Sequence, residues 1–295
     1  MPWPKPRAGE RAAWCPGPRG ALARGVAGRP GAVAAVSGPG QAAPVIVLGY
    51  AHSGAARVLS SLSDSAALAC TTGTGLLPLC EQAAAVWRRA EDKDAESGPI
   101  SALAAASIRA MVGAIVTQIL ARAGRDRWCE FAAAADETAA IFLRLYPAAR
   151  FVCVHRCFSD VARAAIQASP WGLAGPGYGP FPAAYPGNTL AALAAWWSVR
   201  TSALLAFEHD HPRECLRIRY EDLAADQAGT VSAMASFLGI TGTANQAGDL
   251  LAAGTTAEPP GAGPELPIPV ALLPPALLAQ VNDLLERLGY PPLGS

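Results

Sequence analysis

The stretch from Pro44 to Leu59, PVIVLGYAHSGAARVL, constrains the fold of this chain more than any other. It opens with four consecutive aliphatic residues, as is typical of a parallel strand covered on both faces. Gly49 and Gly54 then bracket four residues, which is the GxxxxG spacing of a phosphate-binding loop. Glycines let the backbone turn so that successive N–H groups and the positive end of the next helix face one anion. The sequence predicts a strand, an anion-binding turn and a helix.

The two residues after Gly54 narrow the class of ligand. A magnesium-dependent nucleotide triphosphatase or kinase carries Lys and then Ser or Thr at this point, and the hydroxyl holds the metal. Here the residues are Ala55 and Ala56. The sequence therefore favours a phosphate-binding loop that works without magnesium, and it disfavours a kinase.

Strands and helices alternate along the rest of the chain. Residues 150–155, RFVCVH, form a second apolar run, and Leu216 and Ile218 alternate with Arg217 and Arg219 in a third. Helices are expected at 55–68, 81–91, 100–123, up to 146, up to 166, 188–208, 231–238 and 277–288, with residues 71–80 a loop or short strand. This alternation predicts an α/β, three-layer P-loop-type domain with a central parallel sheet flanked by helices, spanning residues 44–295.

Three details of these helices can be tested. In the helix expected at 100–123, helical spacing places one set of apolar side chains on a shared face, which we expect to be core. The set is Leu103, Ile108, Met111, Ile115 and Ile119. Asn188 is the expected N-cap of the long helix that follows it, and Gly239 is expected to end the helix at 231–238.

Charge and cysteine content limit the partners. Twenty-three basic residues balance twenty-three acidic ones, so no net field attracts nucleic acid or an anionic membrane, and a small-molecule partner is expected. The seven cysteines have no paired CxxC spacing for zinc, so we expect no metal site. Reduced thiols fit a cytoplasmic protein.

Two segments rich in proline and glycine interrupt the pattern. Residues 1–43 have neither a signal-peptide core nor a spanning helix, and we interpret them as a disordered leader. One hypothesis is that they are translated from a start codon placed too far upstream. Residues 169–187 carry four aromatics, namely Trp171, Tyr178, Phe181 and Tyr185. Such a loop is either a lid over an apolar ligand or a long connection fixed to the core by its aromatic side chains.

Three segments taken together resemble the sulfotransferases that use 3′-phosphoadenosine 5′-phosphosulfate (PAPS) as donor. GYAHSGAARVL is similar to their 5′-phosphosulfate loop, and VCVHRCFSDVARA to their 3′-phosphate strand and helix. CLRIRYEDLAADQAGTVSAMASFLGI is similar to their RYEDL segment, and NDLLERLGYP to the end of many bacterial members. The resemblance covers residues 44–292 and implies transfer of a sulfuryl group to a hydroxyl of a small molecule, with no metal.

The resemblance also assigns roles by position. His52 stands where the family has its catalytic Lys or Arg, Arg156 would bind the 3′-phosphate, and Tyr220 would lie near the adenine. Each also has a structural interpretation: a hydrogen-bonded loop histidine, an ordinary salt bridge and a turn residue. The implied donor-binding residues are Gly49, Ala51, His52, Ser53, Gly54, Ala55, Ala56, Arg156 and Tyr220.

The proton of the acceptor needs a base. In the segment where the family carries basic and His residues, this chain has Cys129 to Ala133, so Glu130 is the candidate catalytic base, with Asp136 and Glu137 behind it. The alternative is that these carboxylates only favour the dipole at a helix start.

Four departures from the family pattern support a second hypothesis. Ala55 and Ala164 replace a hydroxyl residue, the Glu130 segment lacks Lys and His, and no Lys or Arg occurs between Arg219 and Arg287 to clamp the 3′-phosphate. Hydrogen bonds to charged groups contribute about 1.5–3 kcal/mol each. The alternative is therefore a catalytically impaired sulfotransferase-fold protein that acts as a binding or scaffold module.

Overall fold

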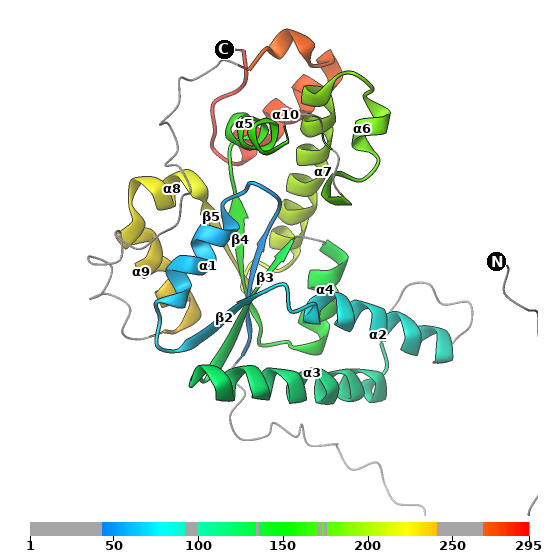
Figure 1. The fold of residues 1–295 in the computed structure, drawn as a ribbon, viewed down its shortest axis with the longest axis vertical. Helices are drawn as coiled ribbons and strands as arrows, with labels where there is room; N and C mark the ends of the chain where they lie inside the picture. Colours follow the sequence, from blue (N-terminus) through cyan, green and yellow to red (C-terminus); the bar gives the residue numbers. More distant parts are fainter. Residues whose placement is uncertain are drawn as a thin grey trace, which may run out of the picture. The chain divides into compact units, whose positions relative to one another are not determined.

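A five-stranded parallel sheet organises the protein. The computed structural model describes residues 43–91, 100–133, 136–169, 173, 176–240 and 268–294. The strands lie in the order β2-β3-β1-β4-β5, and every neighbouring pair is parallel (Figure 1). They are β1 Val45–Gly49, β2 Leu68–Thr72, β3 Arg127–Ala133, β4 Arg150–His155 and β5 Cys215–Arg219. The predicted α/β class is confirmed. The expected leader falls on residues outside the described ranges, apart from residue 43.

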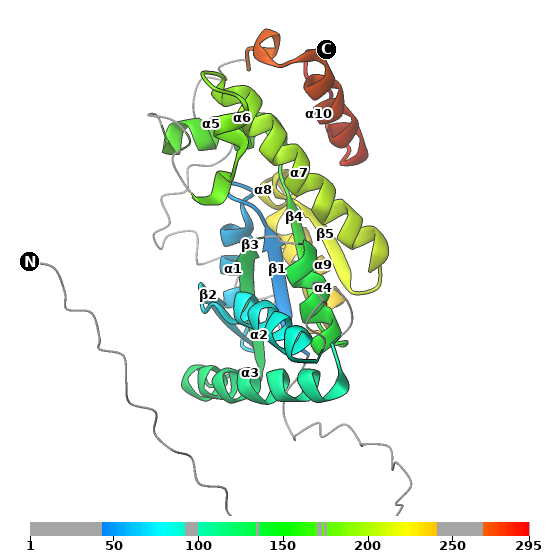
Figure 2. The same cartoon turned by 90° about the vertical axis from the view of Figure 1, so that its right-hand side faces the viewer.

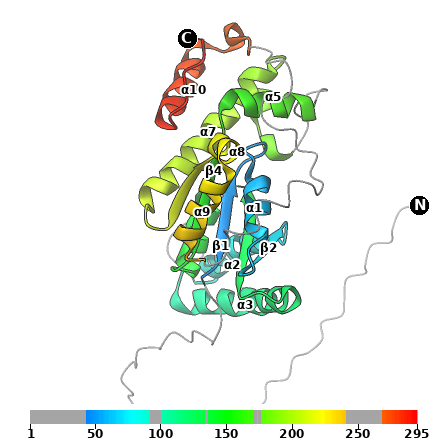
Figure 3. The same cartoon turned by 90° about the vertical axis from the view of Figure 1, so that its left-hand side faces the viewer.

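Two layers of helices cover the sheet. On one face lie α1 Ala55–Ser63, α8 Tyr220–Ala225 and α9 Gln227–Leu238; on the other lie α2 Leu76–Glu91, α3 Ala102–Ala123, α4 Asp136–Leu145 and α7 Thr189–Asp210 (Figures 2 and 3). Alternate residues of β1 point to opposite layers, Val45 and Val47 to the first and Ile46 and Leu48 to the second. Burial on both sides explains why this strand is aliphatic throughout.

A third apolar cluster lies beyond the carboxyl end of β4, at the top of Figure 1. It is built from α5 Phe158–Ala168, η1 Pro176–Tyr178, α6 Phe181–Ala184, α10 Pro275–Arg287 and α7, together with Leu273 directly after η3 Val270–Leu272. Trp196 and Trp197 of α7 are among its largest buried side chains. The expected N-cap of α7 is confirmed, since Asn188 Oδ1 accepts a hydrogen bond from the N–H of Ala191 at 3.0 Å.

The strand order locates a switch point. The chain leaves β1 toward the β2 edge of the sheet, whereas it leaves β4 toward the β5 edge, and β1 and β4 are neighbours. In open α/β sheets the crevice outside the carboxyl ends of two such strands is where ligands bind. The turn after β1 and the residues after β4 are therefore the first place to search for a site.

The region between β1 and α2 differs from the prediction. The first helix ends at Ser63 instead of continuing to residue 68, where a strand, β2, begins. Helix α2 then starts at Leu76, five residues before the expected start. Gly73 and Gly75, with φ of 66° and 72°, make the turn between the two elements. β2 is an edge strand of only five residues, so its sequence carries a weak signal.

The predicted core face of α3 is wrong for three of its five residues. Leu103 is 65% exposed, and Met111 and Ile115 are each 40% exposed, whereas Ile108 is buried. The buried face is instead made of Ala104, Ala105, Ile108, Val112 and Val116.

α3 and α7 are long and apolar enough to cross a membrane by length and composition, but α7 is largely buried within the two apolar clusters that it joins.

Candidate functional site

The turn after β1 is held by close packing of its own atoms. The N–H of Ser53 donates to the carbonyl oxygen of Tyr50 at 3.0 Å, and the N–H of Tyr50 donates to Ser53 Oγ at 3.2 Å. A Cβ at Gly49 would lie 2.6 Å from Ser53 Oγ and 2.7 Å from the Cβ of Ala55. Only glycine fits at 49, and the fully buried Ser53 hydroxyl serves the turn itself.

Backbone conformation alternates through the turn. His52 and Gly54 have positive φ, 65° and 85°. Ala51, which precedes His52, and Ser53, which lies between the two, do not. Such alternation turns successive N–H groups to one side and makes an anion-binding concavity. The N–H groups of Ala55 and Ala56, in the first turn of α1, have no carbonyl partner within that helix. The loop thus offers backbone donors at the positive end of a helix.

Tyr220, the first residue of α8, closes the turn from outside. A Cβ at Gly54 would lie 2.0 Å from Cδ2 of Tyr220, so the ring rests directly on the glycine. The guanidinium carbon of Arg156 lies 4.3 Å from the centre of the same ring. Tyr220 is only 4% exposed, and its contacts brace the loop. Its expected role beside an adenine stays a prediction.

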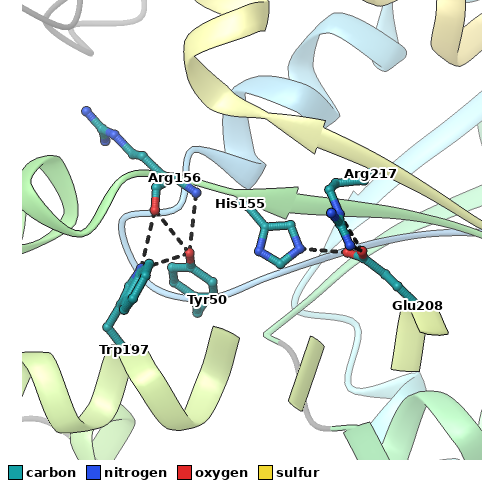
Figure 4. Close-up of polar contacts among 6 residues, drawn as sticks. All are labelled: Tyr50, His155, Arg156, Trp197, Glu208 and Arg217. Carbon is teal, nitrogen blue, oxygen red and sulfur yellow. Dashed lines mark hydrogen bonds and ion pairs between the residues drawn. The ribbon is translucent and has the colours of Figure 1, made fainter. Parts of the chain in front are cut away.

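Arg156, the first residue after β4, contacts the turn directly. Its Nη1 donates to the carbonyl oxygen of His52 at 3.1 Å. Its Nε is buried and has no hydrogen-bond partner among the described residues. Figure 4 shows its side chain extending away from Tyr50 and Trp197. A guanidinium, backbone donors and a helix N-terminus therefore meet at the switch point.

Two residues that the sequence did not reveal hold Arg156 in place. Tyr50 Oη accepts from the N–H of Arg156 at 3.3 Å and donates to its carbonyl oxygen at 3.4 Å (Figure 4). Trp197 Nε1 donates to Tyr50 Oη at 3.1 Å and to the same carbonyl at 3.3 Å. Burial raises the pKa of Tyr50 to about 12, so the phenol stays neutral and can donate. The only sequence hint was an aromatic residue inside the glycine turn.

A buried polar cluster lies behind this platform. His155 Nε2 and Glu208 Oε1 are 2.6 Å apart, and Arg217 donates from Nε and Nη2 to Glu208 Oε2, each at 2.6 Å (Figure 4). His155 is fully buried and Glu208 is 7% exposed. The cluster joins β4, α7 and β5 directly before Arg156. It therefore fixes the end of the strand that presents the guanidinium.

His52 faces the loop that follows α5. Its Nε2 lies 3.1 Å from Tyr178 Oη of η1, and Tyr178 packs on Trp196 with ring centres 5.0 Å apart. Burial, and next the Arg156 guanidinium, lower the pKa of His52. The imidazole is therefore neutral near pH 7 and acts as a hydrogen-bonding group. Of the two interpretations of residues 169–187, the described aromatics support a loop fixed to the core; Trp171 lies outside the described residues.

Comparison with known proteins identifies the family. A sequence profile described as "Sulfotransferase family" matches residues 44–244, more than half of the chain. The chain belongs to the sulfotransferase family. No curated protein sequence matches it significantly.

Solved structures of sulfotransferase domains share the fold. The domain of the Synechococcus PCC 7002 olefin synthase superposes with a TM-score of 0.53 at 16% identity, covering 85% of this chain and 96% of that one. The domain from the curacin biosynthetic pathway gives 0.53 at 14% identity, covering 84% and 98%. At these identities the likeness shows the fold alone.

Glu130, the expected base of this sulfotransferase, is fully engaged elsewhere. It is 3% exposed and pairs in register with Ile46, three residues before Gly49, which is about 10 Å along the strand. Its carboxylate accepts from Thr71 Oγ1 at 2.7 Å, from Thr74 Oγ1 at 2.7 Å and from the N–H of Thr74 at 3.0 Å. These contacts favour a role in fixing the turn between β2 and α2. The side chains of Asp136 and Glu137 lie outside the described residues.

Exchange of Glu130 for glutamine separates the two roles. We expect Glu130→Gln to lower the free energy of unfolding by about 1–3 kcal/mol, because an amide group replaces one of two oxygens that accept hydrogen bonds at a buried site. Turnover at saturating substrate, measured well below the melting temperature, should stay within about threefold of wild type. A loss of turnover above a hundredfold with unchanged stability would restore Glu130 as the base.

No group of three or more His, Cys, Asp or Glu side chains that could hold a metal occurs among the described residues. The chemistry offered by the site itself is anion binding: a guanidinium, backbone donors and a neutral imidazole. Such a set can hold a phosphate or sulfate group and orient a hydrogen bond toward it.

Proposed function

We propose that this sulfotransferase transfers a sulfuryl group from PAPS to a hydroxyl of a small molecule. The observation that carries the proposal is the contact between Arg156 and the carbonyl of His52, which brings the guanidinium that follows β4 against the backbone donors of the turn after β1. The proposal also includes three further properties of this protein. It is cytoplasmic, it needs no metal, and it does not act on nucleic acids or membranes.

In the proposed complex, the 5′-phosphosulfate lies on the donors of residues 51–56. Gly49 and Gly54 allow the turn, Ser53 braces it, and Ala55 and Ala56 supply N–H groups at the start of α1. Arg156 binds the 3′-phosphate, and Tyr220 holds both Arg156 and the loop in register. Backbone donors depend on no side chain, so they remain where the family's hydroxyl residue is Ala55.

The reaction follows from this placement. The acceptor oxygen attacks sulfur in line with the bond between sulfur and the 5′-phosphate oxygen. That bond breaks, and its electron pair leaves with adenosine 3′,5′-bisphosphate. His52 donates a hydrogen bond toward the bridging oxygen, where negative charge develops. The acceptor proton passes to a base. Of the three carboxylates that the sequence offers, Glu130 is held by hydrogen bonds from Thr71 and Thr74, so Asp136 and Glu137 are the preferred candidates.

The acceptor side is apolar in this proposal. Tyr178 lies next to His52, and Trp196 packs on Tyr178. Phe181 and Tyr185 are partly buried on the same cluster. An acceptor that reaches the sulfuryl group passes these rings. A hydroxyl on an aromatic or otherwise apolar body fits such surroundings.

Calorimetry with adenosine 3′,5′-bisphosphate tests the donor site. Binding at micromolar to submillimolar concentration is expected, and no heat at millimolar nucleotide would refute the proposal. Transfer of labelled sulfate from PAPS to a simple phenol then tests the reaction.

The second candidate, a catalytically impaired binding module, is favoured by the neutral His52 in place of a permanent cation. Nucleotide binding without any transfer would support that candidate, and transfer abolished by His52→Ala would exclude it.

Nucleotide binding is expected to draw a proton onto His52. Because the pKa of His52 is lowered in the free protein, an anion bound beside the imidazole raises that pKa, so binding takes up protons and strengthens as the pH falls below about 6.5. Calorimetry at pH 6 in two buffers of different ionisation heat measures this uptake. The nucleotide's own phosphates also exchange protons, and His52→Gln, which lacks only the imidazole, provides the correction. Equal proton exchange in both proteins would contradict the placement of the phosphosulfate.

A further inference from the structure

A second arginine lies at the same tyrosine ring as Arg156. Arg57 belongs to the first turn of α1, and its N–H donates to the carbonyl oxygen of Gly54 at 2.9 Å. Its guanidinium carbon lies 5.9 Å from the centre of the Tyr220 ring, where that of Arg156 lies 4.3 Å away. The two guanidinium carbons are therefore no more than about 10 Å apart.

These two positive charges have no acidic partner among the described residues. None of the ion pairs there includes Arg57 or Arg156. The two acids that directly follow Tyr220 are occupied: Glu221 accepts from the N–H of Cys157 at 3.0 Å and from Tyr290 Oη at 2.5 Å, and Asp222 pairs with Arg219. The buried Nε of Arg156 also lacks a partner. Two like charges held together without a counter-charge mark a site for a multiply charged anion.

We propose that Arg57 is the second cation of the donor site and binds the 3′-phosphate together with Arg156. This inference rests on the proposed function, which places the 3′-phosphate at Arg156. The chain has no Lys or Arg between Arg219 and Arg287 to approach that phosphate from the carboxyl-terminal side. Arg57 approaches from the α1 side instead. Its planar guanidinium matches the geometry of a phosphate.

The test compares two nucleotides that differ only in the 3′-phosphate. Affinities of adenosine 3′,5′-bisphosphate and adenosine 5′-phosphate are measured by calorimetry for the wild type, Arg57→Gln and Arg57→Lys. Arg57→Gln is expected to weaken the bisphosphate by about ten- to a hundredfold, the size of one charge-assisted contact, and to leave the monophosphate within about threefold. Arg57→Lys keeps the positive charge but loses the planar guanidinium that can form two parallel hydrogen bonds. Its affinity for the bisphosphate should lie between those of the wild type and Arg57→Gln.

Arg122→Gln is the matched control, because it removes the same charge from the exposed last turn of α3 and should change neither affinity. Thermal melting verifies that each variant is folded. Equal weakening of both nucleotides by Arg57→Gln, or no weakening of either, would overturn the role of Arg57 while the proposed function stands. A wild type that binds neither nucleotide would instead refute the proposed function, and the role of Arg57 with it.

Discussion

Replacement of Arg156 by alanine is expected to weaken binding of adenosine 3′,5′-bisphosphate by more than about a hundredfold. A bidentate contact to phosphate comprises two hydrogen bonds to charged groups, each worth about 1.5–3 kcal/mol, and every 1.4 kcal/mol is a factor of ten. The change also removes the hydrogen bond to the carbonyl of His52 and the guanidinium over Tyr220. The loop thus loses a brace as well as a cation, so we expect this to be the largest binding effect of any single substitution.

Calorimetry against the wild type measures the loss, and two further variants define its cause. Arg156→Lys keeps the positive charge without the planar fork and should recover part of the affinity. Arg163→Ala removes an arginine of α5 that is paired with Asp160 at 2.6 Å, and it should leave affinity within about threefold. If Arg156→Ala is folded and binds the nucleotide with unchanged affinity, the 3′-phosphate does not bind at the end of β4. The proposed donor site would then lose its basis.

The strands that could be predicted are those whose sequence has a regular apolar pattern. β1 and β4 are covered on both faces, so their sequences are continuous apolar runs and identify them. β2 lies at the edge and ends in the partly exposed Thr71 and the exposed Thr72, so its pattern does not stand out from the helix before it. β5 lies at the other edge, and it could be predicted because Leu216 and Ile218 alternate with two arginines.

The face of α3 could not be predicted for a different reason. Apolar and small residues occur almost all round this helix, so helical spacing offers several faces of similar quality. The larger side chains of Leu103 and Met111 are exposed, while Ala104 and Ala105 are buried where the helix approaches its neighbours closely. Side-chain size does not indicate the buried face when the closest approach requires alanine.

Some residues of the candidate site could be predicted from the sequence, and others could not. The glycines and Arg156 belong to short segments with recognisable spacing, and they lie together as the resemblance implied. Tyr178 and Trp197 come from positions 126 and 147 residues away from their partners in the turn, and no local pattern connects them. Glu130 was assigned by elimination, a method that ignores hydrogen bonds from Thr71 and Thr74. Polar contacts between residues far apart in the chain could not be predicted from the sequence.

The largest effect on stability is expected for Glu208→Ala. Its carboxylate is the shared acceptor for His155 and Arg217, and removal leaves His155 fully buried with no partner among the described residues at either nitrogen. Loss of one member of a buried pair costs about 3–5 kcal/mol, and because the Arg217 side chain is 42% exposed and can turn to water, we expect about 3 kcal/mol. For a domain of this size that lowers the melting temperature by roughly 6–12 °C.

The exposed pair of Arg287 and Asp283, 3.9 Å apart, provides the control for this loss. Asp283→Ala removes a carboxylate from a solvent-screened pair and should change the free energy of unfolding by less than about 1 kcal/mol. Denaturant unfolding of both variants measures the difference. Equal stabilities would mean that the His155 cluster does not hold β4 to α7. If Glu208→Ala also weakens nucleotide binding at temperatures where it is folded, the cluster acts through the adjacent Arg156, because Glu208 itself contacts neither the turn nor the proposed phosphate sites.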